Sequence, residues 1–290
     1  PILAAALLKP IGISGILIVD LVTLVIAITT LLIVTIPQPE RTIEDLEKPN
    51  TFWQDSMFGF KYIIQRPSLF WLQMIFFGGN FMATLGGVLV SPLILASTDQ
   101  NATTLSIVQS AGAIGGVVGS ILITIWGGFK KRVDGVLVGW MASGLFGYML
   151  MGTARGLSIV WIITNFLGAA IVPIVNASNQ AIWQSKVPPK MQGRVFSVRM
   201  MIATLTAPLA MLIAGPLADK VFEPLMRNET SGLSQLFGSL VGTGPGTGMS
   251  LILVFCGFLM VIIGFIGNFI PNVRDVDTIL PDHDAVAAKQ

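Results

Sequence analysis

The sequence contains few of the side chains from which most enzyme sites are built. Its 290 residues include one cysteine, Cys256, and one histidine, His283, which lies in a polar C-terminal stretch. A disulfide framework is therefore excluded, and zinc sites and histidine-dependent catalytic triads lack the residues they need. Charged residues make up only 11% of the chain, whereas ordinary soluble domains carry about 25%. A water-soluble globule is not expected.

Catalytic motifs are also scarce. The stretch 12–15 (GISG) matches the serine motif of intramembrane proteases, but such an enzyme needs a histidine in another span, and none is there. The zinc-protease motif HExxH and the phosphate-binding loop GxxxxGK[ST] are both absent. We therefore predict no enzyme, no catalytic residue, no metal site and no cofactor.

What the sequence does contain is a set of long apolar runs, with hydrophobic residues making up 53% of the chain. Seven runs reach the length of about 20 residues that a membrane-spanning helix needs. They are 13–36, 68–95, 104–127, 134–153, 157–181, 199–220 and 249–270. They are too long and too continuous for the strands of a membrane barrel, which alternate over about ten residues. We predict an all-α membrane protein, a polytopic helical bundle.

The runs divide the chain into four parts. Residues 1–36 hold the last turns of one helix and then a complete span, and 37–67 form a polar linker. Residues 68–270 form a six-helix bundle, and 271–290 form a tail. Because the chain begins within an apolar run and not with a basic leader, we expect a piece of a longer protein, truncated at its N-terminus.

The second half of the linker has the pattern of an amphipathic helix. Phe52, Met57, Phe60 and Ile63–Ile64 fall near one helical face. Such a helix is typical of a segment that lies in the membrane interface.

Lysine and arginine are unevenly shared between alternate loops. Thirteen lie in one set of loops, which includes the linker and the tail, and four lie in the other set. Since basic loops remain in the cytoplasm, we predict a cytoplasmic linker and a cytoplasmic C-terminus.

Small residues recur at helix-packing spacing. Three pairs stand four residues apart: Gly112 and Gly116, Gly115 and Gly119, and Gly135 and Gly139. Such faces let helix backbones approach closely in lipid, and we expect them to pack.

One carboxylate, Asp20, lies inside a predicted span. It is roughly 10 Å from the start of that span at the helical rise. A carboxylate at that depth is costly and indicates a function, here a proton carrier. The alternative is a structural carboxylate near the outer surface, bonded to neighbouring helices.

Neutral amides gather in the span 157–181. Its four amide side chains fall within about 60° of one another on a helical wheel, and two further amides are expected to join them from other helices. The six are Asn80, Gln109, Asn165, Asn176, Asn179 and Gln180. With aromatic and methionine neighbours they predict a cavity for a large, mostly apolar ligand. Hydrogen bonding between helices explains the same residues equally well.

Several segments resemble one family of membrane proteins. Residues 14–23 resemble its sixth-helix opening, and the turn 127–132 (GGFKKR) resembles the second copy of its Gly/Asp/Arg loop motif, without the early Asp. The most specific match is 187–197 (VPPKMQGRVFS), and 214–219 (AGPLAD) and 279–284 (ILPDHD) add to it. The chain resembles the major facilitator superfamily, in the drug-efflux branch that includes macrolide efflux proteins and the enterobactin exporter.

The resemblance implies a fold and a function. The chain would hold the end of helix 5 and helices 6 to 12 of two six-helix bundles that rock about one midplane cavity. The activity implied is export of a small, largely apolar compound, such as a drug or macrolide, by proton antiport across a bacterial plasma membrane. The partners implied are the bilayer, the small-molecule substrate, protons and the missing N-terminal helices, with no nucleic acid. Two alternatives are a siderophore or secreted-metabolite exporter of the same fold, and a non-transporting membrane subunit or sensor.

The resemblance also suggests where coupling and gating occur. Asp20 is the one visible proton-coupling candidate. Lys131, Arg132, Arg194 and Arg199 would lie at the cytoplasmic gate, where they pair with acidic groups or helix C-termini. The alternative is that these four cations only set the topology.

Overall fold

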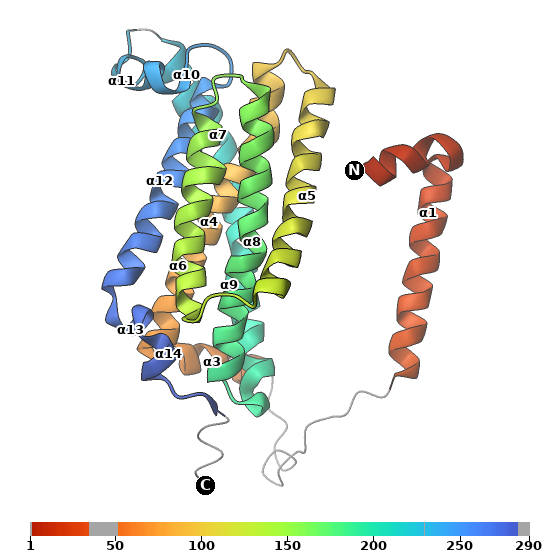
Figure 1. Ribbon diagram of the computed structural model, residues 1–290, viewed down its shortest axis with the longest axis vertical. Coiled ribbons are helices and arrows are strands. Elements are labelled where there is room, and N and C mark those ends of the chain that lie inside the picture. The colour runs from red at the N-terminus through yellow and green to blue at the C-terminus, as the bar shows by residue number, and fades with distance from the viewer. Residues whose placement is uncertain (1, 35–51, 229, 284–290) are drawn as a thin grey trace. The chain divides into compact units, whose positions relative to one another are not determined.

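Long helices dominate the computed structural model, which describes residues 2–34, 52–228 and 230–283. Within these ranges, seven helical segments are long and apolar enough to cross a membrane (Figure 1). They are Gly12–Ile33, Pro67–Ser97, Ala102–Trp126, Arg132–Gly152, Ser158–Lys186, Pro189–Arg227 and Thr247–Phe269. The predicted all-α membrane bundle is confirmed. The polar half of the predicted linker, up to residue 51, and the tail beyond 283 lie outside the described residues.

Contacts along the chain divide it into two units, Pro1–Asn50 and Thr51–Gln290. The described part of the first unit is the helix α1 (Ile2–Ile33), which bends at Gly12. Gly12 has φ +62°, a conformation that glycine adopts without strain. The bend separates the short helical segment at the N-terminus from the span Gly12–Ile33. Most side chains of that span are exposed, so its apolar surface is available to lipid or to other helices.

The second unit begins with α3 (Phe52–Ile64), which covers the predicted amphipathic segment. The sequence predicted an amphipathic helix here, and α3 is a helix that packs against α9 (Pro189–Leu217). A Cβ atom on Gly59 would lie 2.7 Å from the carbonyl oxygen of Arg194. Ile63 is buried, while Met57 and Ile64 are exposed. The apolar residues of α3 are therefore shared between the bundle and its surroundings.

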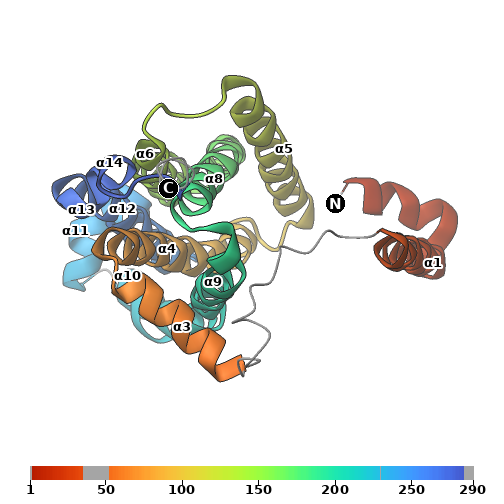
Figure 2. The same ribbon diagram turned by 90° about the horizontal axis from the view of Figure 1, so that it is seen from below.

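Six long segments form the body of the second unit. Helix α4 (Pro67–Ser97) contacts both α9 and α12 (Thr247–Phe269) (Figure 2). Helix α6 (Arg132–Ala142) contacts α12 and α8 (Ser158–Lys186), and α5 (Ala102–Trp126) packs against α8. Large apolar side chains fill the centre, among them Leu69, Leu72, Leu137, Ile182 and Trp183.

The sixth predicted span begins too late. The sequence predicted 199, whereas α9 begins at Pro189. Proline suits the first turn of a helix because its φ is already helical and it has no N–H to satisfy. Pro188 before it is extended, as residues before proline usually are. The apolar run is therefore shorter than the helix, whose first turns lie beside α3.

Small residues bring α8 close to both of its neighbours. On α5, a Cβ atom on Gly115 or Gly119 would overlap a backbone carbonyl oxygen of α8. On α6, Gly135 and Gly139 face side chains of α8. These two predicted packing pairs are confirmed. Gly116, by contrast, faces open space, so Gly112 and Gly116 do not pack together against another helix.

Two segments of π-helix interrupt the spans. The first, η1 (Ser143–Met149), joins α6 to the last turn of its span, α7 (Leu150–Gly152). The second, η2 (Ala218–Phe222), follows α9. Such segments are rare and are found frequently at functional sites.

The two ends of the bundle carry different short helices (Figure 1). One end carries α10 (Glu223–Arg227) and α11 (Gly232–Val241), which lie between η2 and α12 in the chain. The other end carries α3 together with α13 (Pro271–Arg274) and α14 (Val276–Ile279). At the first end, the Glu223 carboxylate accepts hydrogen bonds from the backbone N–H groups of Gly246 at 2.7 Å and Gly248 at 3.0 Å. These bonds satisfy donors at the start of α12.

Candidate functional site

Two adjoining cavities lie between the helices of the second unit. The first, of about 390 Å³, lies between α4, α5, α8 and the span that contains η1. The second, of about 550 Å³, lies between α4, α8 and α9. Asn80 and Asn176 line both cavities. The six predicted amides therefore line two neighbouring cavities.

The first cavity is polar at several points on its wall. Gln109 on α5 donates from Nε2 to the Ser91 hydroxyl on α4, 3.3 Å away, and Asn165 on α8 donates from Nδ2 to the carbonyl oxygen of Val108 at 2.7 Å. Both bonds join different helices. Asn80 donates instead to the carbonyl oxygen of Phe76 in its own helix, at 2.9 Å. In this cavity the amides act as wall residues and as links between helices at once.

The second cavity combines amides with aromatic rings. Asn179 is buried, and its Oδ1 accepts a hydrogen bond from Trp183 Nε1 at 3.2 Å. Gln180 Oε1 accepts a hydrogen bond from Arg199 Nη1, also at 3.2 Å. Phe76 and Phe196 line the same hollow. This wall offers apolar surface with a few fixed polar groups, as ligand cavities usually do.

Arg199, one of the four cations expected at the cytoplasmic gate, lies in the wall of the second cavity. Its guanidinium lies over the ring of Trp183, 4.4 Å from the centroid, and 5.2 Å from the centroid of Phe196. It lines the second cavity together with Gln180. Arg194, a little earlier in the same helix, lies over the ring of Phe58 at 5.6 Å. The predicted gate cations thus have different surroundings.

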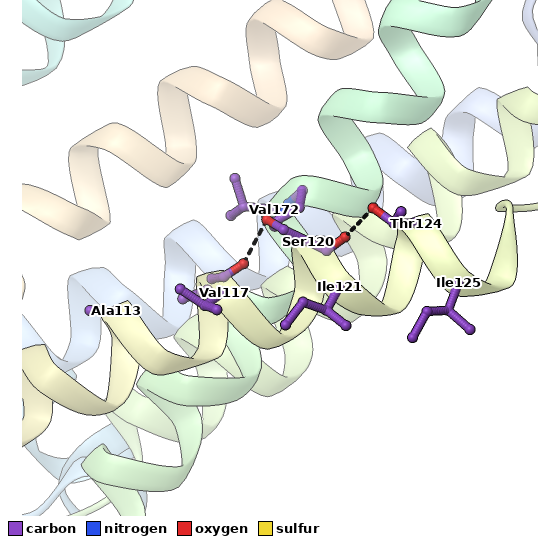
Figure 3. Close-up of a pocket in the computed structure, with 10 residues that line it drawn as sticks. Ala113, Val117, Ser120, Ile121, Thr124, Ile125 and Val172 are labelled. Carbon is purple, nitrogen blue, oxygen red and sulfur yellow. Dashed lines mark hydrogen bonds between the residues drawn. The ribbon is translucent and has the colours of Figure 1, made fainter.

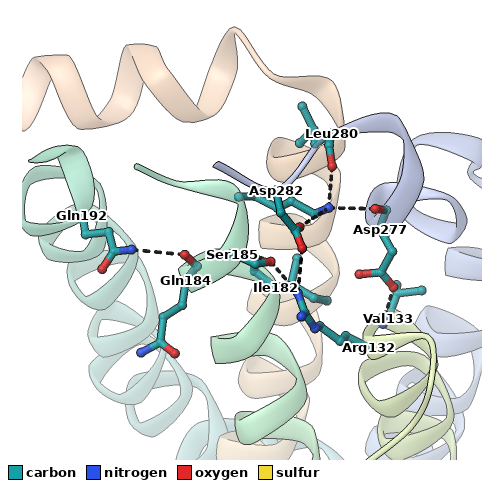
Figure 4. Close-up of polar contacts among 10 residues, drawn as sticks. Arg132, Val133, Ile182, Gln184, Ser185, Gln192, Asp277, Leu280 and Asp282 are labelled. Atoms are coloured by element: carbon teal, nitrogen blue, oxygen red, sulfur yellow. Dashed lines mark hydrogen bonds and ion pairs between the residues drawn. The ribbon is translucent and has the colours of Figure 1, made fainter. Parts of the chain in front are cut away.

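A polar cluster joins the C-terminal segment to the end of the bundle (Figure 4). Lys186, whose side chain is 2% exposed, forms an ion pair with Asp282 at 2.8 Å. Its ammonium group also donates to the carbonyl oxygen of Asp277 at 2.7 Å and to that of Leu280. The hydrogen bond from Lys186 holds the pKa of the Asp282 carboxyl below its usual value.

Arg132 joins the same cluster from the start of α6. Its Nη1 donates to the Ser185 hydroxyl at 2.6 Å and lies 4.0 Å from the Asp282 carboxylate. The backbone N–H of Val133 donates to the Asp277 carboxylate at 3.4 Å. The predicted gate residue Lys131 precedes them and is exposed. Arg132 therefore helps to fasten α6, α8 and the C-terminal segment to one another.

Asp20 lies on α1, in the first unit of the chain. Its side chain is exposed, and its backbone carbonyl accepts a hydrogen bond from the Thr23 hydroxyl at 2.9 Å. The alternative prediction, that neighbouring helices bond to the Asp20 carboxylate, stays a prediction, because α1 is the one helix described in this unit.

A further hollow, of about 780 Å³, runs along α5 and α8 (Figure 3). Aliphatic and small side chains line most of it, including Val117, Ile121 and Val172. Its hydroxyls are used within the helix, because Ser120 donates to the carbonyl oxygen of Gly116 and Thr124 donates to that of Ser120. Because both hydroxyls donate within α5, this open surface offers a ligand fewer polar groups than the two cavities do.

Sequence reasoning missed several members of these sites. Gln73, Ser143 and Tyr148 line the cavities but were not singled out. Gln73 stands out as an amide early in the span 68–95, which was a usable signal. Lys186 was counted only as a loop charge, and no pattern in the sequence links it to Asp282. Across the described residues, no group of three or more His, Cys, Asp or Glu side chains is arranged to hold a metal ion.

The fold and the cavities together define a polytopic helical membrane protein with a polar-lined interior. The profile of the Major Facilitator Superfamily matches residues 1–211, and the chain belongs to this superfamily. The superfamily is one of transporters, and the predicted family and the predicted all-α membrane fold are confirmed.

Curated relatives carry efflux names. The chain is 25% identical over 228 residues to macrolide efflux protein A of Streptococcus pyogenes, covering 76% of this chain and 54% of that protein. It is 26% identical over 218 residues to macrolide efflux protein A of Enterococcus faecalis, covering 73% and 65%. It is 24% identical over 181 residues to multidrug efflux pump Tap of Mycolicibacterium fortuitum, covering 62% and 37%. The chain thus spans about half the length of the first relative. No solved structure matches it significantly.

Proposed function

We propose that this chain forms part of a transporter that exports small, largely apolar compounds from bacteria by alternating access. The observation that carries the proposal is the convergence of six amides from α4, α5 and α8 on two neighbouring cavities beside aromatic rings. Such a wall suits ligands that are held by apolar contact and oriented by a few hydrogen bonds. The macrolide and multidrug names of the relatives agree with it.

The proposal extends to orientation and gating. The end that carries α3, α13 and α14 is proposed to face the cytoplasm, since basic side chains concentrate there. At that end, the contacts of Arg132 and Lys186 with the C-terminal segment hold α6 and α8 together. Lys131, Arg132 and Arg194 then act at the cytoplasmic side of the pathway, and Arg199 acts in its wall.

Proton antiport is the proposed driving reaction, with Asp20 as the coupling carboxylate. A carboxylate inside an apolar span changes charge when it is protonated, and that change alters the cost of exposing it to each side of the membrane. The same fold serves the alternative cargo, a siderophore or secreted metabolite. A non-transporting subunit or sensor is the alternative of another class.

The test is export from cells. The chain, with its complementary helices restored, is expressed in efflux-deficient bacteria, and accumulation of a macrolide and of a lipophilic dye is measured with and without a protonophore. We expect lower accumulation that the protonophore abolishes, and loss of this effect in Asp20→Asn. Asp219→Asn, which changes an exposed carboxylate of η2, is the matched control and should export normally. Unchanged accumulation of both compounds, with expression confirmed, would favour the non-transporting alternative.

A further inference from the structure

Arg199 is a cation in a cavity wall without an acidic partner. Among the described residues that line the two cavities there is no aspartate or glutamate, and Arg199 is the one charged side chain. No carboxylate of the described residues forms an ion pair with it. Arg199 lies in Pro189–Arg227, a segment long and apolar enough to cross a membrane. A charge in such a segment is costly, and by default it indicates a function.

The surroundings of Arg199 fix its guanidinium in place. Trp183 and Phe196 lie against it, and Gln180 accepts a hydrogen bond from its Nη1. None of these three neighbours neutralises the charge. Its Nε is buried and has no hydrogen-bond partner among the described residues. The guanidinium is therefore held between two rings and an amide, and its Nε–H is a buried donor without a partner among the described residues.

A second unsatisfied group lies in the same wall. Gln73, on α4, is 2% exposed, and its Oε1 has no hydrogen-bond partner in the described part of the chain. It lines the second cavity. Buried polar groups normally find partners. Because an amide oxygen only accepts hydrogen bonds, the partner that fits Gln73 is a donor such as a hydroxyl group, whereas the partner that fits Arg199 is an anion.

We propose that Arg199 and Gln73 form a subsite for an organic anion, and that the exported compound carries a carboxylate on a largely apolar body. The guanidinium binds the carboxylate by charge-assisted hydrogen bonds, and Gln73 Oε1 accepts a hydrogen bond from a hydroxyl group on the body of the compound. Phe76 and Phe196 contact the apolar body. This inference rests on the proposed export function, and within it favours an acidic metabolite over a cationic drug.

The test is equilibrium binding to the 290-residue chain in lipid nanodiscs, with empty nanodiscs subtracted. The probes are fusidic acid, an apolar carboxylate, and its neutral methyl ester. We expect the acid to bind more tightly than the ester. Arg199→Gln should weaken binding of the acid about tenfold and leave the ester unchanged, because it removes a charge-assisted hydrogen bond.

Three further variants keep the result interpretable. Arg199→Lys retains the charge and should retain part of the preference for the acid. Gln73→Leu, which removes an acceptor and retains Arg199, should weaken the acid and the ester alike. Lys190→Gln removes an exposed cation from the same helix, outside both cavities, and should change neither affinity. Retained binding of the ester by Arg199→Gln reports that this variant is folded.

Equal affinity of the wild type for acid and ester would overturn the subsite. Equal weakening of both probes by Arg199→Gln, or binding of neither probe, would also overturn it. Export of a macrolide from cells tests the proposed function separately. A chain that exports the macrolide but does not distinguish acid from ester loses only this inference.

Discussion

The ammonium group of Lys186, at the end of α8, lies 2.8 Å from the carboxylate of Asp282, beyond α14. The lysine is almost fully buried, and the same ammonium group donates to two carbonyl oxygens of the C-terminal segment. A buried lysine without these partners would be costly. The C-terminal segment therefore covers Lys186 and is held in place by its hydrogen bonds and ion pair with that lysine.

Lys186→Met should loosen this segment. The substitution leaves Asp282 and two carbonyl groups without their donor, with an expected loss of about 1–2 kcal/mol, since Asp282 is partly exposed. Faster tryptic cleavage after Arg274 and a lower unfolding temperature in detergent would report the loss. Lys190→Met, at an exposed lysine, serves as the control. Equal protection of the segment in Lys186→Met would show that burial of Val273 and Val276 is enough to hold it.

The same pair predicts how the segment responds to pH. The hydrogen bond from Lys186 lowers the pKa of Asp282 in the folded protein. The pair therefore contributes its full stabilisation of the folded segment above the pKa of an unfolded aspartate, about 3.9. That stabilisation is lost as the pH falls through the lower pKa of Asp282 in the folded protein. A spin label on Thr278→Cys should stay equally immobile from neutral pH to about pH 4 and become mobile below it. Cys256 is buried and should not react with the label. Release between pH 5 and 7 would contradict the prediction.

Gly115→Ala should separate α5 from α8. A methyl group there overlaps the carbonyl oxygen of Phe166, and overpacking of this kind typically costs about 1–3 kcal/mol. The neighbouring substitution Gly116→Ala is the matched control, because nothing lies within 4 Å of its added methyl group. Thermal unfolding of the two variants should differ, with only Gly115→Ala destabilised. Similar unfolding temperatures would mean that the two helices shift apart at little cost.

Glu223→Ala should weaken the start of α12. The carboxylate satisfies the N–H groups of Gly246 and Gly248, and loss of a helix cap typically costs about 0.5–2 kcal/mol. Faster hydrogen exchange at residues 246–250 would measure the effect. Asp219→Asn, an exposed carboxylate nearby in sequence, should leave that exchange unchanged.

Much of the fold could be predicted because lipid thickness sets the length of each apolar run. The runs that became α4, α5 and α12 needed only small adjustments at their ends. The start of α9 at Pro189 was missed because its first turns are not apolar enough to register as a span. Packing through Gly115 and Gly119 followed from spacing alone, whereas the open position of Gly116 depends on how α8 lies beside α5.

The sequence predicted which types of residue line the candidate site, but not which residues hydrogen-bond to one another there. The wheel placed Asn176, Asn179 and Gln180 on one face, and all three line the second cavity. The sequence did not reveal that Arg199 bonds to Gln180, since the two residues lie on different helices. Gln73 likewise becomes informative only when its buried oxygen is found without a partner.

The π-helical turn η1 affects how this chain compares with other sequences. A π turn holds one residue more than the α-helical turn that it replaces, so residues before Ser143 and after Met149 are out of phase by one position. A relative with an uninterrupted α-helix there will align only with a one-residue gap inside the span. An ungapped alignment will pair Tyr148 with a position on another face of the helix. Sequence identity counted across this span without that gap therefore underestimates how many residues occupy equivalent positions in the two structures.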